Sequence, residues 1–201
     1  MQLYGSQTSP YVRRIRLLLA ETPHQFINMN IFAEADRQKL LALNPTLKIP
    51  MLQNNERMMV RLLAFALNAS DTLQFTKGLS SESDEAELWD LALDGTVNLW
   101  VEFGQADEKW LKKACSRAKQ VHLYCYGGRV VPIWWQANQS ALSRYQQLSI
   151  WDLPEQSVQQ MATLVQRSMN LQCNISEGQI WLSDDSQSVL IEPVLLKAAS
   201  R

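Results

Sequence analysis

The 201-residue sequence predicts an α/β amino-terminal half followed by an all-helical carboxyl-terminal half. Three observations support this fold class. Short apolar strands alternate with amphipathic helices over residues 1–70, an order typical of an α/β layer structure. A polar stretch at residues 71–84 then interrupts the pattern. Beyond that stretch, apolar side chains recur three and four residues apart, which is the spacing of helices.

The amino-terminal half contains a clear helix start. Ser9 can cap a helix, and Pro10 suits its first turn, where no main-chain hydrogen bond is lost. Pro23 ends this helix. In chain order, the expected elements are a strand at residues 2–5, the helix from Ser9, a strand at 25–31, a helix at 34–43, a hairpin within 50–60 and a helix at 61–68.

The carboxyl-terminal half is expected to begin with helices over residues 85–103 and 106–124. Ser149 and Asp152 have the spacing of a capping box, in which a hydroxyl and a carboxylate accept hydrogen bonds from exposed main-chain N–H groups. They predict a further helix that starts near residue 149. The expected organisation is therefore a first domain over residues 1–70, a linker over 71–84 and a helical domain over 85–201.

Three segments near the amino terminus resemble the glutathione transferase superfamily. Residues 2–6 (QLYGS) resemble its first strand, residues 8–16 (TSPYVRRIR) the start of its active-site helix, and residues 44–52 (NPTLKIPML) its cis-proline segment. On this resemblance the chain is identified as a divergent member, with a thioredoxin-like domain followed by a helical domain. The resemblance implies glutathione as co-substrate, a small electrophile as second substrate, and a homodimer.

Ser9 is the catalytic residue that the resemblance implies. A hydroxyl donor at a helix amino terminus stabilises the thiolate of glutathione, and together they can lower the pKa of the thiol from about 8.5 to about 7. The alternative is that Ser9 only caps its helix. Tyr11 offers a neighbouring hydroxyl, but it falls inside the helix.

The resemblance also places the glutathione main chain against Ile49, whose N–H and C=O would pair with it as an added strand does. Pro50 is the candidate for a cis peptide bond, with a trans proline at a strand start as the alternative. Lys48 would reach the glycyl carboxylate of glutathione, or would be a solvated loop lysine.

Arg61 and Leu62 depart from the family pattern. Transferases of this family carry an acidic residue and a serine where this chain has Arg61 and Leu62, and those residues hold the γ-glutamyl group. Losing one partner of a desolvated charge pair weakens binding by about 2–5 kcal/mol. Two functions therefore stay open: a glutathione-dependent transferase, or a non-catalytic interaction or regulatory protein of the same fold that has lost efficient glutathione binding.

Composition limits the other possibilities. The net charge of −1 argues against nucleic acid as the main partner, because phosphate binding needs a basic face. No apolar run is long enough to span a bilayer, and the chain begins without a leader-like segment, so a cytoplasmic protein without membrane association is expected. Three cysteines without a C-x-x-C pair indicate reduced, mostly buried thiols. Two histidines leave few ligands for zinc, so no metal is expected.

Several aromatic residues follow the expected linker. By position they are candidates for an electrophile pocket between the two domains, but aromatic residues at helical spacing more often belong to a core. These residues are Trp89, Trp100, Phe103 and Trp110.

Overall fold

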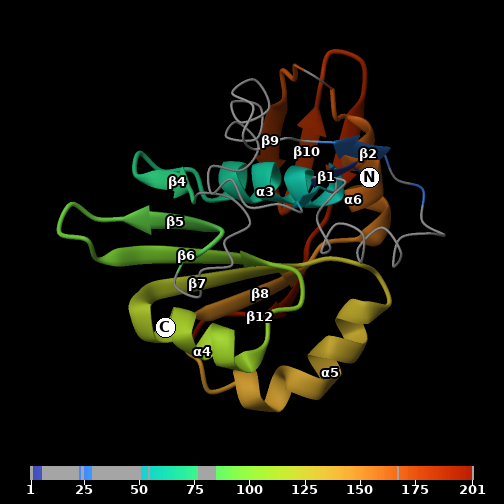
Figure 1. Cartoon of the computed structure of the whole chain (residues 1–201). Coiled ribbons are helices and arrows are strands. Elements are labelled where there is room, and N and C mark those ends of the chain that lie inside the picture. The colour runs from blue at the N-terminus through green and yellow to red at the C-terminus, as the bar shows by residue number, and fades with distance from the viewer. Residues whose placement is uncertain are drawn as a thin grey trace. The chain divides into compact units, whose positions relative to one another are not determined.

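The structure, a computed structural model, describes residues 2–5, 23, 25–28, 51–53, 55–76, 85–166 and 168–200. The chain divides into two compact units. The smaller unit comprises residues 1–58 and 77–85, and the larger unit comprises residues 59–76 and 86–201. Most elements of both units are labelled in Figure 1.

The smaller unit contains a three-stranded sheet in the order β2-β1-β3. Strand β1 (Gln2–Gly5) is parallel to β2 (Gln25–Asn28) and antiparallel to β3 (Met51–Gln53). Leu3 pairs with Phe26 on one side and Leu52 on the other, and its side chain is fully buried. The strand predicted at residues 2–5 is confirmed, and so is the part of the strand predicted at 25–31 that lies within the described residues.

Helix α3 (Asn55–Leu67) begins before residue 61, where the sequence placed its start. The predicted second hairpin strand at residues 57–60 is therefore wrong. Its buried positions explain the difference, because they follow helical rather than alternating spacing. The buried residues of α3 are Met59, Val60, Leu63 and Ala64.

The larger unit is built on a six-stranded mixed sheet in the order β12-β8-β7-β6-β5-β4. Strands β6, β7 and β8 are parallel to one another, and the remaining neighbours are antiparallel. The strand bounds are β4 (Leu73–Phe75), β5 (Leu88–Leu91), β6 (Val97–Phe103), β7 (Ala118–Cys125), β8 (Leu148–Asp152) and β12 (Val194–Lys197).

Helices α4 (Glu108–Arg117) and α5 (Val130–Leu142) connect the three parallel strands. Parallel neighbours need such crossovers, and crossovers of one hand that step in one direction place their helices on the same face. Figure 1 shows both helices below the sheet. The core of this layer is a cluster that includes Trp100, Leu111, Ala114, Val121, Leu123, Val131, Leu142, Leu148 and Ile150.

The last part of the larger unit forms a small antiparallel sheet in the order β11-β10-β9. Helix α6 packs on β11, and the Ser157 hydroxyl donates to the Leu190 C=O at 2.9 Å. Glu177 and Gly178 have φ values of 51° and 83°, which is the backbone that a two-residue hairpin turn requires. The element bounds are α6 (Glu155–Thr163), β9 (Gln172–Ser176), β10 (Gln179–Ser183) and β11 (Ser188–Ile191).

The prediction of a thioredoxin-like domain followed by an all-α domain is wrong, because the larger unit is dominated by sheets. Residues 85–103 contain β5 and β6, and residues 106–124 contain α4 and most of β7. Ser149 lies within β8, where its hydroxyl accepts a hydrogen bond from the Ala199 N–H at 3.0 Å, so it starts no helix. Strand β4 lies inside the predicted linker, and the predicted domain boundaries stay predictions.

Membrane spans were sought among the described helices, and none is both long enough and apolar enough to cross a bilayer.

Candidate functional site

Glu102, near the end of β6, is the most buried carboxylate in the described part of the chain, with 7% exposure. Its Oε1 accepts a hydrogen bond from the indole Nε1 of Trp100 at 2.7 Å. Trp100 itself is fully buried and makes edge contacts with Trp89 and Trp110. Glutamate side chains are rarely buried unless they are paired or functional, so Glu102 marks a candidate site.

Glu87 is a second poorly exposed carboxylate beside β6. Its main-chain N–H donates to the Val101 C=O at 3.1 Å, so Glu87 lies next to the residue that precedes Glu102. Its Oε2 is 3.8 Å from Nε of Arg61, and the two side chains are only 14% and 19% exposed. The Arg61 guanidinium also lies over the Phe75 ring, 5.4 Å from its centroid.

Arg61 lies in α3, Glu87 directly precedes β5 and Glu102 lies in β6, and these three residues are here named the acidic centre. Two carboxylates suit a hard cation such as Mg²⁺, which proteins often bind through one or two carboxylates together with water and phosphate oxygens. A guanidinium suits phosphate through its planar set of donors. No group of three or more His, Cys, Asp or Glu side chains in the described ranges is arranged to hold a metal ion, so a cation here would complete its shell with water or substrate.

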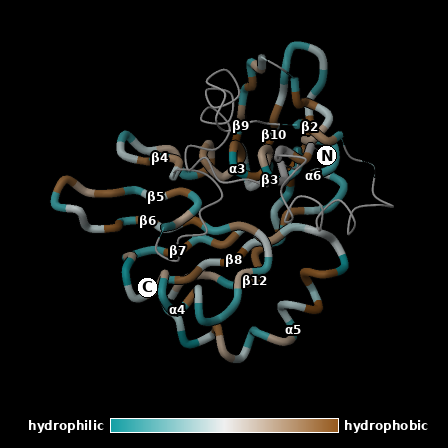
Figure 2. The backbone as a smooth tube through the Cα atoms, viewed as in Figure 1, coloured by the Kyte–Doolittle hydropathy of each residue, from teal (hydrophilic) through white to brown (hydrophobic). Residues whose placement is uncertain are grey.

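Helix α4 starts a few residues after Glu102 and presents a basic surface. Its ten residues include four cations and a single acid, Glu108. The cations recur three and four residues apart, which places them on neighbouring positions of the helix surface. They are Lys109, Lys112, Lys113 and Arg117, and the hydrophilic stretch that they form is visible on α4 in Figure 2.

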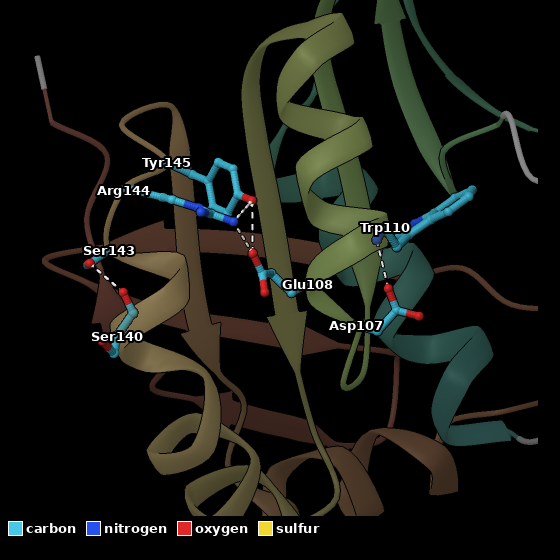
Figure 3. A network of polar contacts seen from close by, with 7 residues as sticks. All are labelled: Asp107, Glu108, Trp110, Ser140, Ser143, Arg144 and Tyr145. Atoms are coloured by element: carbon cyan, nitrogen blue, oxygen red, sulfur yellow. Dashed lines mark hydrogen bonds and ion pairs between the residues drawn. The ribbon is translucent and has the colours of Figure 1, made fainter.

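Glu108 is tied up in a polar network that fixes α4 against the segment after α5 (Figure 3). The Arg144 guanidinium donates to its Oε1 and forms an ion pair with it, and the Tyr145 hydroxyl donates to the same oxygen at 3.2 Å. Asp107 caps the helix by accepting from the Trp110 N–H at 2.7 Å. Glu108, the acid of α4, is thus neutralised by its ion pair with Arg144. The four cations of α4 therefore leave the helix surface basic.

The carboxyl ends of the parallel strands meet beside these elements. The Gly104 N–H donates to the Tyr124 C=O at 2.9 Å, and the Leu153 N–H donates to the Cys125 C=O at 2.9 Å. The Gln105 amide donates to the Tyr126 C=O at 2.5 Å. In α/β sheets this edge is the usual place for ligands.

A second polar cluster lies on β7 and involves neutral groups. His122 and Tyr124 each bond to the Asn68 amide, and both rings contact Trp151. Burial lowers the pKa of His122 to about 4 and raises that of Tyr124 to about 12. Burial raises the pKa of the Cys125 thiol as well, with Asp152 adding to the effect. These groups are uncharged at neutral pH, which suits a structural core better than an anion or metal site.

The structure describes only some of the site residues predicted from the sequence. Ser9, Lys48, Ile49 and Pro50 lie outside the described residues. Arg61 and Leu62 lie in α3, where Arg61 faces Glu87 rather than ending a hairpin. Trp100 and Phe103 belong to the core, as the alternative interpretation of the aromatic residues predicted.

Sequence reasoning missed Glu87 and Glu102. The available signal was the strict alternation of Val97, Leu99, Val101 and Phe103, which is a strand pattern of period two. It would have placed Glu102 on a buried strand rather than on a helix.

The fold and the site define an α/β protein with a mixed sheet, two crossover helices on one face and a buried acidic centre. A family model described as YaeQ protein matches residues 24–193. The chain belongs to the YaeQ family.

The relatives agree with this assignment. The uncharacterized protein YaeQ of Escherichia coli strain K12 is 40% identical over 157 residues, which is 78% of this chain and 86% of the relative. The corresponding protein of Salmonella typhi is 41% identical over 160 residues, covering 80% and 88%.

Solved structures of the family are similar to this fold. The YaeQ protein from Xanthomonas axonopodis pv. citri gives a TM-score of 0.70 at 36% identity, covering 76% of this chain and 86% of that one. The YaeQ protein from Pseudomonas syringae gives 0.68 at 30% identity, covering 75% and 83%.

These findings overturn the identification as a glutathione transferase. The resemblance depended on residues 2–16 and 44–52, whereas the YaeQ match extends over most of the chain. Both functions inferred from the resemblance, transferase and inactive relative of a transferase, are withdrawn with it.

Proposed function

We propose that the larger unit hydrolyses phosphodiester bonds of a nucleic acid with the help of Mg²⁺. The observations that support this proposal most directly are two poorly exposed carboxylates on neighbouring segments of the sheet, Glu87 with 14% exposure and Glu102 with 7%, and the pairing of Glu87 with Arg61. Keeping carboxylates out of water is expensive, and a bound cation offsets that cost.

Each member of the acidic centre has a distinct role in this reaction. Glu87 and Glu102 would hold Mg²⁺, which when bound would supply Lewis acidity for activating water and for polarising a phosphate oxygen. In the overall hydrolysis, water adds to phosphorus, the bond to the leaving sugar oxygen breaks, and that oxygen takes up the proton that the water loses. Arg61 stabilises the negative charge that develops on the phosphate oxygens.

Helix α4 supplies the contacts to the nucleic-acid backbone. Its four cations stand on a helix whose single acid is already bound by Arg144. Phosphate contacts of this kind provide affinity without sequence preference. The net charge of −1 led to the expectation that nucleic acid is not the main partner. A net charge, however, does not show how charges are distributed over a surface.

The first experiment measures Mg²⁺ binding by calorimetry and cleavage of single- and double-stranded DNA and RNA, with Mg²⁺ or with a chelator. We expect Glu87→Gln and Glu102→Gln to weaken Mg²⁺ binding and to slow cleavage by about 100-fold, a barrier change of about 3 kcal/mol. The matched control is Glu192→Gln, which alters an exposed carboxylate bonded to Gln179. Chelator-resistant cleavage, or equal loss in the control, contradicts the proposal.

The second experiment tests α4. Replacing Lys109 and Lys112 by alanine should weaken binding to every sequence alike and reduce the slope of log affinity against log salt by about 1–2. Arg129→Ala, an exposed cation that precedes α5, is the matched control. An unchanged salt slope in the double variant contradicts a role for this helix.

Location and assembly enter as parts of the same proposal. A cytoplasmic protein is consistent with three free cysteines, two of them buried. The resemblance to glutathione transferases no longer supports a homodimer. A homodimer stays a prediction, which analytical ultracentrifugation can test.

A further inference from the structure

A groove of about 480 Å³ lies beside the carboxyl-terminal part of α5. It is separate from the acidic centre: its walls come from α5, the turn that follows it, the last residue of β12 and the carboxyl-terminal tail. Grooves of this volume suit small organic molecules. The lining residues with functional side chains are Trp135, Gln139, Ser140, Ser143, Lys197 and Ser200.

Lys197 brings an ammonium group to this groove. Its Nζ donates to the C=O groups of Tyr145 and Leu148 at 2.8 and 2.9 Å, and to that of Ala198 at 3.3 Å. Two donors are thus firmly engaged, while the third makes a long bond at an exposed position. An anion in the groove can replace that third bond without disturbing the other two.

The ammonium has no carboxylate partner among the described residues. The Cys115 thiol acts on Lys197 electrostatically, but burial raises the pKa of that thiol to about 11, so it is neutral at pH 7. The charge of Lys197 is therefore met by carbonyl dipoles alone. A half-buried cation in this state attracts an anionic ligand.

The remaining lining residues indicate the rest of the ligand. Trp135 is half-buried and offers a flat apolar surface. The Gln139 amide and the Ser140 hydroxyl make no side-chain hydrogen bond within the described part of the chain, so both remain available as donors. The Ser143 hydroxyl donates to the Ser140 C=O at 2.7 Å and so stabilises the last turn of α5, which contains Gln139 and Ser140 (Figure 3).

We propose that this groove binds a small aromatic carboxylate, with the ring on Trp135 and the carboxylate at Lys197, Gln139 and Ser140. The ring and the charge are both needed, since neither a neutral ring nor a small aliphatic acid satisfies the whole groove. This proposal is independent of phosphodiester hydrolysis.

The test is ligand-detected NMR and calorimetry with benzoate, benzamide and acetate. We expect benzoate to bind about tenfold more tightly than benzamide or acetate. Lys197→Met should remove the preference for benzoate over benzamide, while Lys197→Arg should keep part of it. Trp135→Ala should weaken both aromatic ligands. The controls are Lys119→Met and Trp181→Ala, which alter a lysine and a tryptophan outside the groove.

Thermal melting of each variant shows whether it remains folded. If the Lys197→Met variant unfolds, the affinities of the wild type for benzoate, benzamide and acetate still test the proposal, together with the Trp135→Ala variant. Equal affinity for benzoate and benzamide overturns the proposal. So does a lack of benzoate binding at about 10 mM, a concentration at which even a weak site is occupied.

Discussion

Nδ1 of His122 lies 2.7 Å from Oδ1 of Asn68, and this contact joins β7 to the end of α3. The Asn68 amide nitrogen donates to the Ala64 C=O at 2.7 Å and to the Tyr124 hydroxyl at 2.9 Å. Because the amide nitrogen is used as a donor, Oδ1 is the acceptor, and His122 must carry its proton on Nδ1. His122 is therefore a neutral imidazole held in one tautomer.

This state of His122 predicts a specific pH dependence of stability. Burial lowers its pKa from 6.5 to about 4 in the folded protein. Below pH 6.5 the unfolded chain takes up a proton that the folded chain does not, so stability is fully present above that pH and is lost as pH falls towards 4. The loss is at most about 3 kcal/mol. Urea unfolding at several pH values measures it.

The matched variant is His122→Gln, which keeps an amide donor towards Asn68 but does not titrate. Its stability should fall less steeply between pH 6.5 and 4 than that of the wild type. Identical slopes in the two proteins would rule out His122 as the source.

The hydrogen bond from Trp100 to Glu102 should contribute measurably to stability. Trp100→Phe keeps a large apolar ring in the core but removes the donor at 2.7 Å. A buried acceptor that loses its donor destabilises the folded state by about 1–3 kcal/mol. Chemical unfolding gives this value, and Trp181→Phe, at an exposed tryptophan, should change it little. A stability loss of equal size in both variants would contradict the assignment.

Arg61 and Glu87 should be energetically coupled. Removing one partner of a poorly exposed ion pair is strongly destabilising, by about 3–5 kcal/mol for a fully buried pair. A double-mutant cycle of Arg61→Met and Glu87→Gln should therefore show a smaller loss in the double variant than the sum of the single losses. Additive losses would show that the 3.8 Å contact does not contribute.

The three thiols should react at different rates in the folded protein. Burial raises the pKa of all three thiols, but Cys115 and Cys125 are buried whereas Cys173 is only half-buried. A disulfide reagent at neutral pH should modify Cys173 first, because the thiolate is the reactive form and access is required. Mass spectrometry identifies the modified residue, and unfolding in urea should equalise the three rates. Early modification of Cys125 would argue against the described core.

Part of the fold was predictable because local signals and tertiary structure agreed. The strands at residues 2–5 and 25–28 and the second half of α3 were found from apolar spacing alone. The prediction failed in the carboxyl-terminal half, where residues 97–103 and 118–124 were assigned to helices but form β6 and most of β7. Short segments that contain several apolar residues can fit a helix as well as a strand.

The acidic centre could not be predicted for a related reason. On the sequence alone, Arg61 was interpreted only as a residue that disrupts a glutathione site. Its partner Glu87 lies 26 positions further along the chain, so no local pattern connects the two residues. Which side chains meet across a sheet depends on register, and register is set by strand pairing that no local window contains.

The sequence by itself determined a foldable chain with a large apolar fraction and the strands that begin at Gln2 and Gln25. The tertiary structure decided the rest: that β5 and β6 pair as antiparallel strands, and that Glu87 hydrogen-bonds to the residue that precedes Glu102. The physical reason is that local spacing fixes which face of an element is apolar, whereas burial against distant segments selects between helix and strand and brings charges together.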